Sequence, residues 1–442
     1  MNPRELLIDS FRAALSAADP LVIVPAHLPA PPKGRTVVVG AGKAAAAMAK
    51  AVETHWPAGA SLEGIVITRY AHGYDGISAD DAPLTRIRVL EAGHPVPDEA
   101  GEAAAHEILS LAASLGADDL LLVLVSGGGS SLLSLPVTGI SMADLKAVTS
   151  ELLACGAPIQ EMNIVRKHLS GIQGGRLAAA TKARVLSLII SDVTGDDPSA
   201  IASGPTAPDP STYQDALEIL NAYRIVPPLA VIRHLSNGAR GDIAETLKPD
   251  DAIFSRVENR VIGTAHASLS RAAAFFQQRG ITPMILGDGV TGEAREVAKV
   301  YSALVQQIRQ HHHPLQPPVA LISGGECTVT LRKGPEEPGH GGRCTEFLLS
   351  LAIELNGCEH VHALACDTDG IDGSEDNAGA YLSPTSLQRA MAEGLSAKKL
   401  MSANNAYGFF APIGDLVVTG PTRTNVNDYR IIFIDRQRET AA

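Results

Sequence analysis

The sequence has few aromatic residues and no excess of positive charge. Aromatic residues make up 4% of the 442 residues, too few for the stacking platforms on which single-stranded nucleic acids bind. The 36 Lys and Arg residues against 48 Asp and Glu residues give a formal net charge of −12, which argues against a basic nucleic-acid surface. These shortages argue against a nucleic-acid-binding protein.

Cysteines are also few, and the apolar runs are short. The five cysteines are odd in number and form no CxxC pair, which fits a reducing cytosol better than a disulfide framework. No apolar run reaches the roughly 18–20 residues that a membrane span requires. Residues 1–20 indicate an amphipathic helix without the apolar core of a signal peptide. We therefore expect a cytoplasmic protein that binds neither membranes nor nucleic acid.

What the sequence does contain is an alternation of apolar β-type runs and Ala-rich helical stretches. This alternation is typical of a doubly wound α/β fold, and a chain of 442 residues predicts two or three domains. A polar, glycine-containing stretch at 235–249 is the expected linker between a Rossmann-like α/β/α domain at 1–245 and a smaller α/β domain at 255–442. Strands of the first half are predicted at 36–39, 64–68, 87–90, 120–125 and 185–190.

Two glycine-rich turns follow apolar runs of the buried-strand type. One comes after residues 120–125 and the other after residues 319–323. Glycines let the backbone form a concave nest and approach an anion closely. Both turns are therefore candidate phosphate-binding sites of a nucleotide enzyme, and the nine candidate residues are Ser126, Gly127, Gly128, Gly129, Ser130, Ser131, Gly324, Gly325 and Glu326.

A third turn, at residues 40–45, matches the GxGxxA form of the dinucleotide fingerprint. The match is incomplete, because Arg69 stands where an acidic residue is expected after the next strand. Lys43 lies in the first turn of the predicted helix, where a cation opposes the helix dipole. An anion bound between the lysine and the helix end would explain this placement, and a solvated lysine is the alternative.

Carboxylates are concentrated after two predicted strands. Asp192 follows the strand at 185–190, and ligands of open α/β sheets gather beyond such strand ends. Asp192 is therefore expected to accept a proton or bind a cation, although Asp196 and Asp197 are close enough to leave the identity of the base open. Asp367 and Asp369 complete the predicted metal ligands, since Mg²⁺ binds through one or two carboxylates plus phosphates. A tight turn without metal is the alternative for this second segment.

Cationic side chains for an anionic substrate are predicted at three places. Arg166 and Lys167 could bind a carboxylate or a phosphate, with a solvated helix face as the alternative. Arg343 precedes a predicted helix and could reach a phosphate. His94 lies in a proline-rich loop before a helix for which Asp98 is the expected N-cap.

Taken in series, these motifs resemble the class II glycerate kinases, the family whose carboxy-terminal half is called the MOFRL domain. The resemblance covers most of the chain in order, through residues 39–44, 93–98, 126–131, 163–170, 191–197, 324–326, 367–373 and 420–428. It implies a two-domain enzyme that phosphorylates D-glycerate at the 2-hydroxyl with ATP and a divalent metal, giving 2-phosphoglycerate. An active site in a cleft between the two domains is the matching hypothesis.

The resemblance also implies residue roles. The family's catalytic lysine matches Lys43, its aspartate matches Asp192 and its arginine matches Arg343. Two positions depart from the family pattern, because Cys344 stands where Asn is usual and Arg423 stands where Gly is expected. Some relatives carry the name hydroxypyruvate reductase.

Two other functions compete with the kinase interpretation. An NAD(P)H-dependent hydroxypyruvate reductase would use the GxGxxA turn, but the missing acidic residue speaks against it. A non-catalytic sugar-acid or nucleotide-binding regulator would need an output module, and the sequence shows none. The oligomeric state stays open, with a homodimer among the options.

Overall fold

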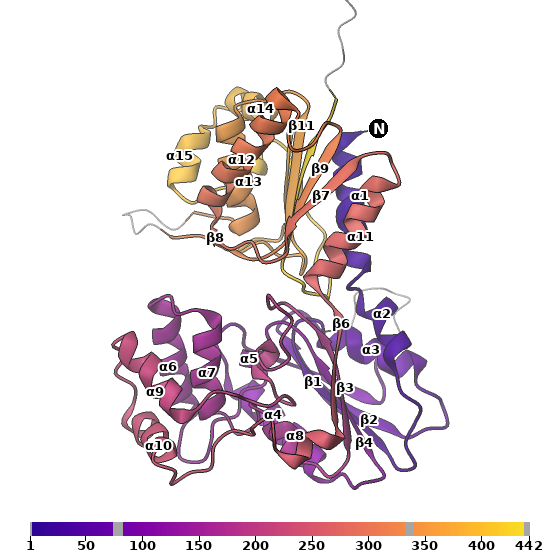
Figure 1. Ribbon diagram of the computed structural model, residues 1–442, viewed down its shortest axis with the longest axis vertical. Coiled ribbons are helices and arrows are strands. Elements are labelled where there is room, and N and C mark those ends of the chain that lie inside the picture. Colours follow the sequence, from indigo (N-terminus) through magenta and orange to yellow (C-terminus); the bar gives the residue numbers. More distant parts are fainter. Residues whose placement is uncertain (1, 74–82, 332–338, 437–442) are drawn as a thin grey trace, which may run out of the picture. The chain divides into compact units, whose positions relative to one another are not determined.

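The computed structural model describes residues 2–73, 83–331 and 339–436, which form two compact units (Figure 1). The larger unit comprises Pro20–Ile262. The smaller unit combines the amino-terminal segment Met1–Asp19 with Gly263–Ala442. Each unit has its own six-stranded sheet, which confirms the predicted two-domain α/β architecture.

The sheet of the larger unit is of the doubly wound type. Its strands are, in spatial order, β3 (Ile87–Ala92), β2 (Leu62–Arg69), β1 (Thr36–Ala41), β4 (Leu120–Val125), β5 (Arg184–Ile190) and β6 (Val257–Gly263). The pairs from β3 through β5 are parallel, and every residue of β1 and β4 is buried, as expected for strands covered on both faces. The chain order reverses between β1 and β4, the switch point at which such sheets bind ligands.

Helices flank this sheet, and a further helical group has its own core. α3 (Ala45–His55) follows β1, and α4 (Glu99–Ala113) begins where Asp98 accepts a hydrogen bond from the Gly101 N–H at 3.0 Å, so the predicted N-cap is confirmed. α6 (Met142–Ala154), α7 (Ile159–Leu169), α9 (Tyr213–Ala222) and α10 (Leu229–Ala239) lie together and share a hydrophobic core (Figure 1). The short helices are α2 (Pro20–Ile23), α5 (Gly129–Leu132) and α8 (Arg176–Ala179).

The sheet of the smaller unit is mixed. Its strands are, in spatial order, β13 (Leu416–Val417), β12 (Gly379–Leu382), β11 (Val361–Asp367), β14 (Asp428–Ile434), β9 (Val319–Ser323) and β7 (Thr282–Gly287). Only β7 and β9 pair in parallel within this sheet of described residues. Two further short strands, β8 (Gly292–Glu293) and β10 (Cys327–Thr328), pair separately.

Helices cover both faces of the mixed sheet. Ile432 and Ile434 of β14 join the core formed with α12 (Ala294–His311) and α13 (Arg343–Leu355), whereas Ile431 and Phe433 join the core formed with α1 (Pro3–Ser16) and α11 (Ala265–Gln277) (Figure 1). This split follows from the two-residue period of a strand. The remaining helices are α14 (Ser386–Ala392), α15 (Ala397–Ser402) and α16 (Tyr407–Phe410). Within the described ranges, no helix combines the length and apolarity needed to cross a membrane.

The unit boundaries differ from the predicted limits of 245 and 255. The expected linker at 235–249 begins inside α10 and continues as a loop held by the larger unit, where the Tyr213 N–H donates to Glu245 Oε1 at 2.9 Å. β6 does not begin the smaller unit but forms the edge strand beside β5. α1 belongs to the smaller unit, in which it packs against α11.

Candidate active site

Three predicted site segments leave the larger sheet at the same edge. The last residue of β1, Ala41, is in register with Val125 of β4, which is in turn in register with Ile189 of β5. Lys43, the Ser126–Ser131 turn and Asp192 follow these three strand ends directly. The switch point of the sheet therefore carries the predicted lysine, glycine-rich turn and carboxylate on neighbouring strands.

The loops after β1 and β4 are bonded to one another. The Lys43 N–H donates to the Gly127 carbonyl at 2.8 Å, and the Ala44 N–H donates to Ser126 Oγ at 2.9 Å. A Cβ atom at Gly42 would lie 2.1 Å from Ser126 Oγ, so only glycine permits this approach. The N–H groups that a dinucleotide fingerprint turns toward a pyrophosphate are here occupied by the neighbouring turn.

Gly128 brings a histidine and the lysine to the glycine-rich turn. Its backbone is left-handed, with φ +80°, and a Cβ atom there would lie 2.9 Å from His94 Nε2 and 3.5 Å from Lys43 Cγ. The His94 and Lys43 side chains therefore pack over Gly128. Three residues that the sequence nominated separately are thus neighbours in the fold.

The other end of the turn lines a small pocket. Ser130 and Ser131 are part of its wall together with Arg166, and the remaining lining residues are Pro97, Ser134, Leu135, Leu145, Thr149, Ser170 and Gln173. Gln173 donates through Nε2 to the Ser130 carbonyl at 2.8 Å and to the Leu133 carbonyl at 2.9 Å. The segment after the turn is therefore fixed by a buried amide that the sequence analysis did not nominate.

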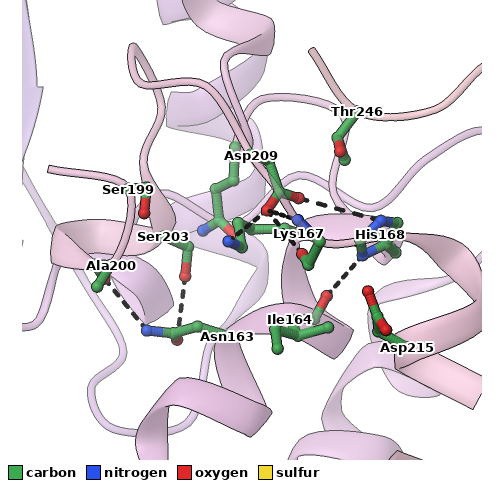
Figure 2. A network of polar contacts seen from close by, with 12 residues as sticks. Asn163, Ile164, Lys167, His168, Ser199, Ala200, Ser203, Asp209, Asp215 and Thr246 are labelled. Atoms are coloured by element: carbon green, nitrogen blue, oxygen red, sulfur yellow. Dashed lines mark hydrogen bonds and ion pairs between the residues drawn. The ribbon is translucent and has the colours of Figure 1, made fainter. Parts of the chain in front are cut away.

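Lys167, next to Arg166, lies in a different environment. Its Nζ donates to Asp209 Oδ1 at 2.7 Å (Figure 2), and the two side chains are 7% and 0% exposed. Burial alone would raise the pKa of the Asp209 carboxyl, but the Lys167 ammonium and the Ser211 hydroxyl hold it below its usual value. The structure thus gives Lys167 a buried ion pair, while its predicted contact with substrate stays a prediction.

The buried pair belongs to a network around α7. His168 Nδ1 donates to the Ile164 carbonyl at 2.8 Å, and its Nε2 lies 3.3 Å from Glu245 Oε2. Asn163 donates through Nδ2 to the Ala200 carbonyl at 3.1 Å and accepts from the Ser203 hydroxyl at 3.1 Å (Figure 2). Ser203 Oγ also lies 2.9 Å from Ser130 Oγ. α7 is therefore tied to the glycine-rich turn through one serine.

The three aspartates after β5 have distinct surroundings. Asp197 accepts from the Ser199 N–H at 2.9 Å and from the Ser199 hydroxyl at 2.8 Å, which makes it the turn residue that the sequence predicted among the three. Asp196 has a left-handed backbone, with φ +55°. Asp192 is half-buried and stands closest to the strand end. This placement favours Asp192 as the residue that faces a ligand.

In the smaller unit, Arg343 gathers three carboxylates. At the start of α13 its guanidinium contacts Asp428 Oδ1 at 2.8 Å, Asp367 Oδ2 at 2.6 Å and Glu326 Oε1 at 2.9 Å. Burial alone would lower the pKa of Arg343, but the three carboxylates hold it well above its usual value. The structure therefore joins the predicted Glu326, Arg343 and Asp367 and adds Asp428.

Asp367 and Asp369, the predicted metal ligands of this unit, accept backbone bonds. The Asp369 N–H donates to Asp367 Oδ1 at 3.0 Å and the Ile371 N–H donates to Asp369 Oδ1 at 2.9 Å. No cluster of three or more metal-binding side chains occurs among the residues that the structure describes. The metal assignments of Asp192, Asp367 and Asp369 stay predictions.

Gly324 and Gly325 are held by a buried arginine. Arg430 is 1% exposed, and its Nη2 donates to the carbonyls of both glycines, at 3.1 Å for Gly325.

A buried carboxylate also fixes the first turn of α13, which begins at Arg343. Asp372 is fully buried and accepts from the N–H groups of Cys344 and Thr345 at 2.9 and 2.8 Å. Sequence reasoning assigned no role to Arg430 or to Asp428, the last residue of the family motif at 420–428, because Gly324, Gly325 and Arg343 lie far away from them along the chain.

The two departures from the family pattern have structural counterparts. The Cys344 thiol is buried in the core of the smaller unit, and burial raises its pKa well above the usual value, so it leaves the contacts of Arg343 intact. Arg423 has a φ of +59°, a conformation that suits glycine and costs other residues about 1–2 kcal/mol. The expectation of glycine at position 423 therefore has a backbone reason.

Two family models match this chain, and proteins similar over nearly its whole length are known. The model of the domain of unknown function DUF4147 matches residues 6–236, and that of the MOFRL family matches residues 319–428. A glycerate 2-kinase of Pyrococcus horikoshii is 39% identical over 437 residues, which cover 97% of this chain and 94% of that protein. A protein of Agrobacterium vitis named as a hydroxypyruvate reductase is 48% identical over 435 residues, covering 98% and 95%.

A solved structure agrees with these relatives. The crystal structure of glycerate kinase from Thermotoga maritima matches with a TM-score of 0.83 at 35% identity, over 98% of this chain and 99% of that one. The resemblance predicted from the motifs is confirmed by both kinds of similarity. The chain belongs to the class II glycerate kinase family, with the DUF4147 domain in its first half and the MOFRL domain in its second.

Proposed function

We propose that this chain is an ATP-dependent D-glycerate 2-kinase, which transfers the γ-phosphoryl group to the 2-hydroxyl and releases 2-phosphoglycerate and ADP. The observation that carries the proposal is the convergence of Lys43, His94 and the Ser126–Ser131 turn at the switch point of the larger sheet. The names of the kinase relatives, which match over nearly the whole chain, support the same reaction.

Phosphoryl transfer depends on positioning and on charge stabilisation. Asp192 is proposed to orient the 2-hydroxyl and to accept its proton as the bond to phosphorus forms. Lys43 is proposed to offset the negative charge that builds on the transferring group. Lys43 follows β1 and Asp192 follows β5, and β4 pairs with both strands, so the sheet fixes the two strand ends from which these residues extend.

The glycine-rich turns are proposed to hold the phosphates of ATP. Within the described residues, the N–H groups of Gly127 and Gly128 make no hydrogen bond to the protein. Successive free backbone N–H groups of this kind form anion-binding nests. Gly324, Gly325 and Glu326 of the smaller unit are the second proposed group.

Arg343 and a divalent metal are proposed to stabilise the negative charge of the phosphates during phosphoryl transfer. Arg343 would place its guanidinium on a phosphate by exchanging one of its carboxylate partners, of which Glu326 is the exposed one. The carboxylates of Asp192, Asp367 and Asp369 are the hard oxygen donors that Mg²⁺ takes, and Mg²⁺ usually completes its shell with phosphates and water. When bound, the ion would neutralise charge on the phosphate oxygens.

The hydroxypyruvate reductase named among the relatives is the second candidate. The structure disfavours nicotinamide binding at the GxGxxA turn, since Ser126 Oγ fills the space beside Gly42 and bonds to the Ala44 N–H. A dinucleotide bound there would have to displace the β4 turn. The reductase interpretation therefore loses the one sequence motif on which it rested.

Substitution of Lys43 tests the proposal. Lys43→Ala should fold normally and lose on the order of 10³-fold in kcat, measured by coupling ADP release to a dye-linked assay with D-glycerate. Lys33→Ala, at an exposed position of the same unit, is the matched control and should keep full activity. Retention of more than about a tenth of the wild-type rate in Lys43→Ala would remove Lys43 from the mechanism, since about 1.4 kcal/mol already spans tenfold.

A further inference from the structure

The small pocket at the Ser130–Ser131 end of the turn contains one charge. Among the described residues that line it, Arg166 is the one ionisable side chain, and the other polar groups are hydroxyls and the amide of Gln173. The hydroxyl hydrogens of Ser131 and Ser134 are directed to the backbone carbonyls of Gly128 and Ser131. The guanidinium is therefore the main donor that the pocket offers to a ligand.

Arg166 differs from Arg176 and Arg256, two other half-buried arginines of its unit. Arg176 donates to the Lys167 carbonyl at 2.8 Å, and Arg256 donates to the Thr181 carbonyl at 2.6 Å, whereas within the described residues Arg166 has no hydrogen bond or ion pair. Burial lowers the pKa of Arg166 to about 10. A desolvated guanidinium without an anion is unfavourable, and a bound carboxylate or phosphate would supply the missing partner.

The position of the pocket favours a carboxylate of the acceptor substrate. Ser131 lines the pocket, while Gly128, three residues earlier, packs against Lys43 and His94. Positions three apart on a helical turn are about 5–6 Å from each other. A 2-hydroxy acid has its reactive hydroxyl one carbon away from the carboxylate, which matches this short separation.

We infer that this pocket binds the carboxylate of the 2-hydroxy acid and that Arg166 makes the enzyme select an acid over a neutral polyol. The inference rests on the proposed function. Guanidinium and carboxylate pair through two parallel hydrogen bonds, which a lysine cannot reproduce. Arg166 would therefore determine substrate class, while Lys43 and Asp192 act on the hydroxyl and the phosphoryl group.

The helix that carries Arg166 is fixed on its other sides. Asn163 is anchored to Ala200 and Ser203, and Lys167 is anchored to Asp209. Because Ser203 also contacts Ser130, the helix and the turn are held by the same side chain. The pocket is thus organised before a ligand binds, which limits the entropy cost of binding.

Calorimetric binding without turnover tests the inference. D-glycerate, D-lactate and glycerol would be titrated into the wild-type protein, Arg166→Gln and Arg166→Lys, with and without a non-hydrolysable ATP analogue. The wild type should bind both acids and not glycerol. Arg166→Gln should raise the Kd for both acids by about 10- to 100-fold, and Arg166→Lys should give a smaller rise. Arg233→Gln, at an exposed position of the same unit, is the control and should leave every Kd unchanged.

Three results would overturn the inference. One is a Kd for glycerate that stays within threefold in Arg166→Gln, and another is a wild type that binds neither acid. The third is a raised Kd for the ATP analogue alone, which would assign the pocket to a nucleotide phosphate. Acid binding that depends on Arg166 in a protein that transfers no phosphoryl group would contradict the proposed function and leave the carboxylate pocket standing. Arg166→Lys keeps the test open if Arg166→Gln does not fold.

Discussion

Replacement of Lys167 separates a structural role from a substrate-binding role. The sequence nominated Lys167 for substrate, but the structure pairs it with Asp209 at 2.7 Å with almost no exposure of either side chain. Lys167→Met would keep most of the side-chain volume and leave the Asp209 carboxylate buried without its cation. Removal of one partner from a buried ion pair costs about 3–5 kcal/mol. We therefore expect the free energy of unfolding of the larger unit to fall by that amount.

Urea unfolding followed by circular dichroism measures this change. Lys146→Met is the control, because Lys146 and Glu99 form an exposed ion pair at 2.8 Å with 31% and 75% side-chain exposure, and such pairs contribute at most about 1 kcal/mol. The double variant Lys167→Met/Asp209→Leu should regain much of the lost stability, since it removes the unpaired charge as well. A Lys167→Met protein of wild-type stability with a raised KM for glycerate would refute the structural assignment.

The same pair predicts a pH dependence with a definite sign. Because the pKa of Asp209 is lowered in the folded protein, its contribution to stability is present above the unfolded pKa of about 3.9 and is lost as pH falls through the folded value. In Lys167→Met the carboxyl loses its cation and binds a proton more readily. The stability difference between the two proteins should therefore be largest near pH 7 and shrink below about pH 5. His168 Nε2 lies 4.0 Å from Asp209 Oδ2. When His168 protonates at low pH, it supplies a cation to Asp209 in Lys167→Met and so also reduces the stability difference between the two proteins.

Three further predictions concern the turn, the arginine and the cysteines. Gly128→Ala should lower kcat at least tenfold, because its Cβ would press on His94 and Lys43. Gly139→Ala is the control, since Gly139 has φ +90° and open space around its Cβ; it carries the same backbone strain of about 1–2 kcal/mol and should keep its activity. Equal kcat values for the two variants would show that the contact of Gly128 with His94 and Lys43 is unimportant. Arg343→Lys should lower kcat by about 10³-fold in the coupled kinase assay, and a loss below tenfold would exclude a role at the phosphates. Iodoacetamide followed by mass spectrometry should modify the exposed Cys155 before the buried Cys327, Cys344 and Cys366, and early modification of Cys344 would contradict its burial.

The strands of the larger sheet were predictable because their physical cause is local. Residues 120–125 are apolar without interruption, and they form β4 over the predicted bounds. The parallel sheet then brings Lys43, the glycine-rich turn and Asp192 to one edge. The general location of the candidate site in this unit thus follows from strand ends and their order.

The different surroundings of the adjacent cations Arg166 and Lys167 were not predictable from the sequence. Arg166 and Lys167 are adjacent in sequence, but successive residues of α7 point in different directions around the helix axis. One lines a pocket and the other meets Asp209, 42 residues further along. The expected linker at 235–249 differs from the structure for a related reason. Its polar residues Glu245 and Lys248 belong to the network around α7, in which Lys248 Nζ donates to the Asp209 carbonyl at 3.1 Å.

Contacts between segments far apart in the sequence also determine the side-chain pairings and the helix packing of the smaller unit. Arg343 and Asp428 are 85 residues apart, and no local pattern links them. The position of α1 has the same origin, because its apolar face packs on α11 and β14 rather than on its neighbours in sequence. Such pairings depend on the whole fold, so the sequence predicted the residues but not their partners.

Phosphorus NMR of the purified protein with D-glycerate, ATP and Mg²⁺ tests the central claim most directly. A parallel cuvette with hydroxypyruvate and NAD(P)H, followed by absorbance, tests the reductase alternative. We predict a new phosphomonoester signal that coincides with 2-phosphoglycerate, together with ADP, and no oxidation of the nicotinamide. Nicotinamide oxidation without any phosphomonoester would contradict the account and return the Gly40–Ala45 turn to dinucleotide binding.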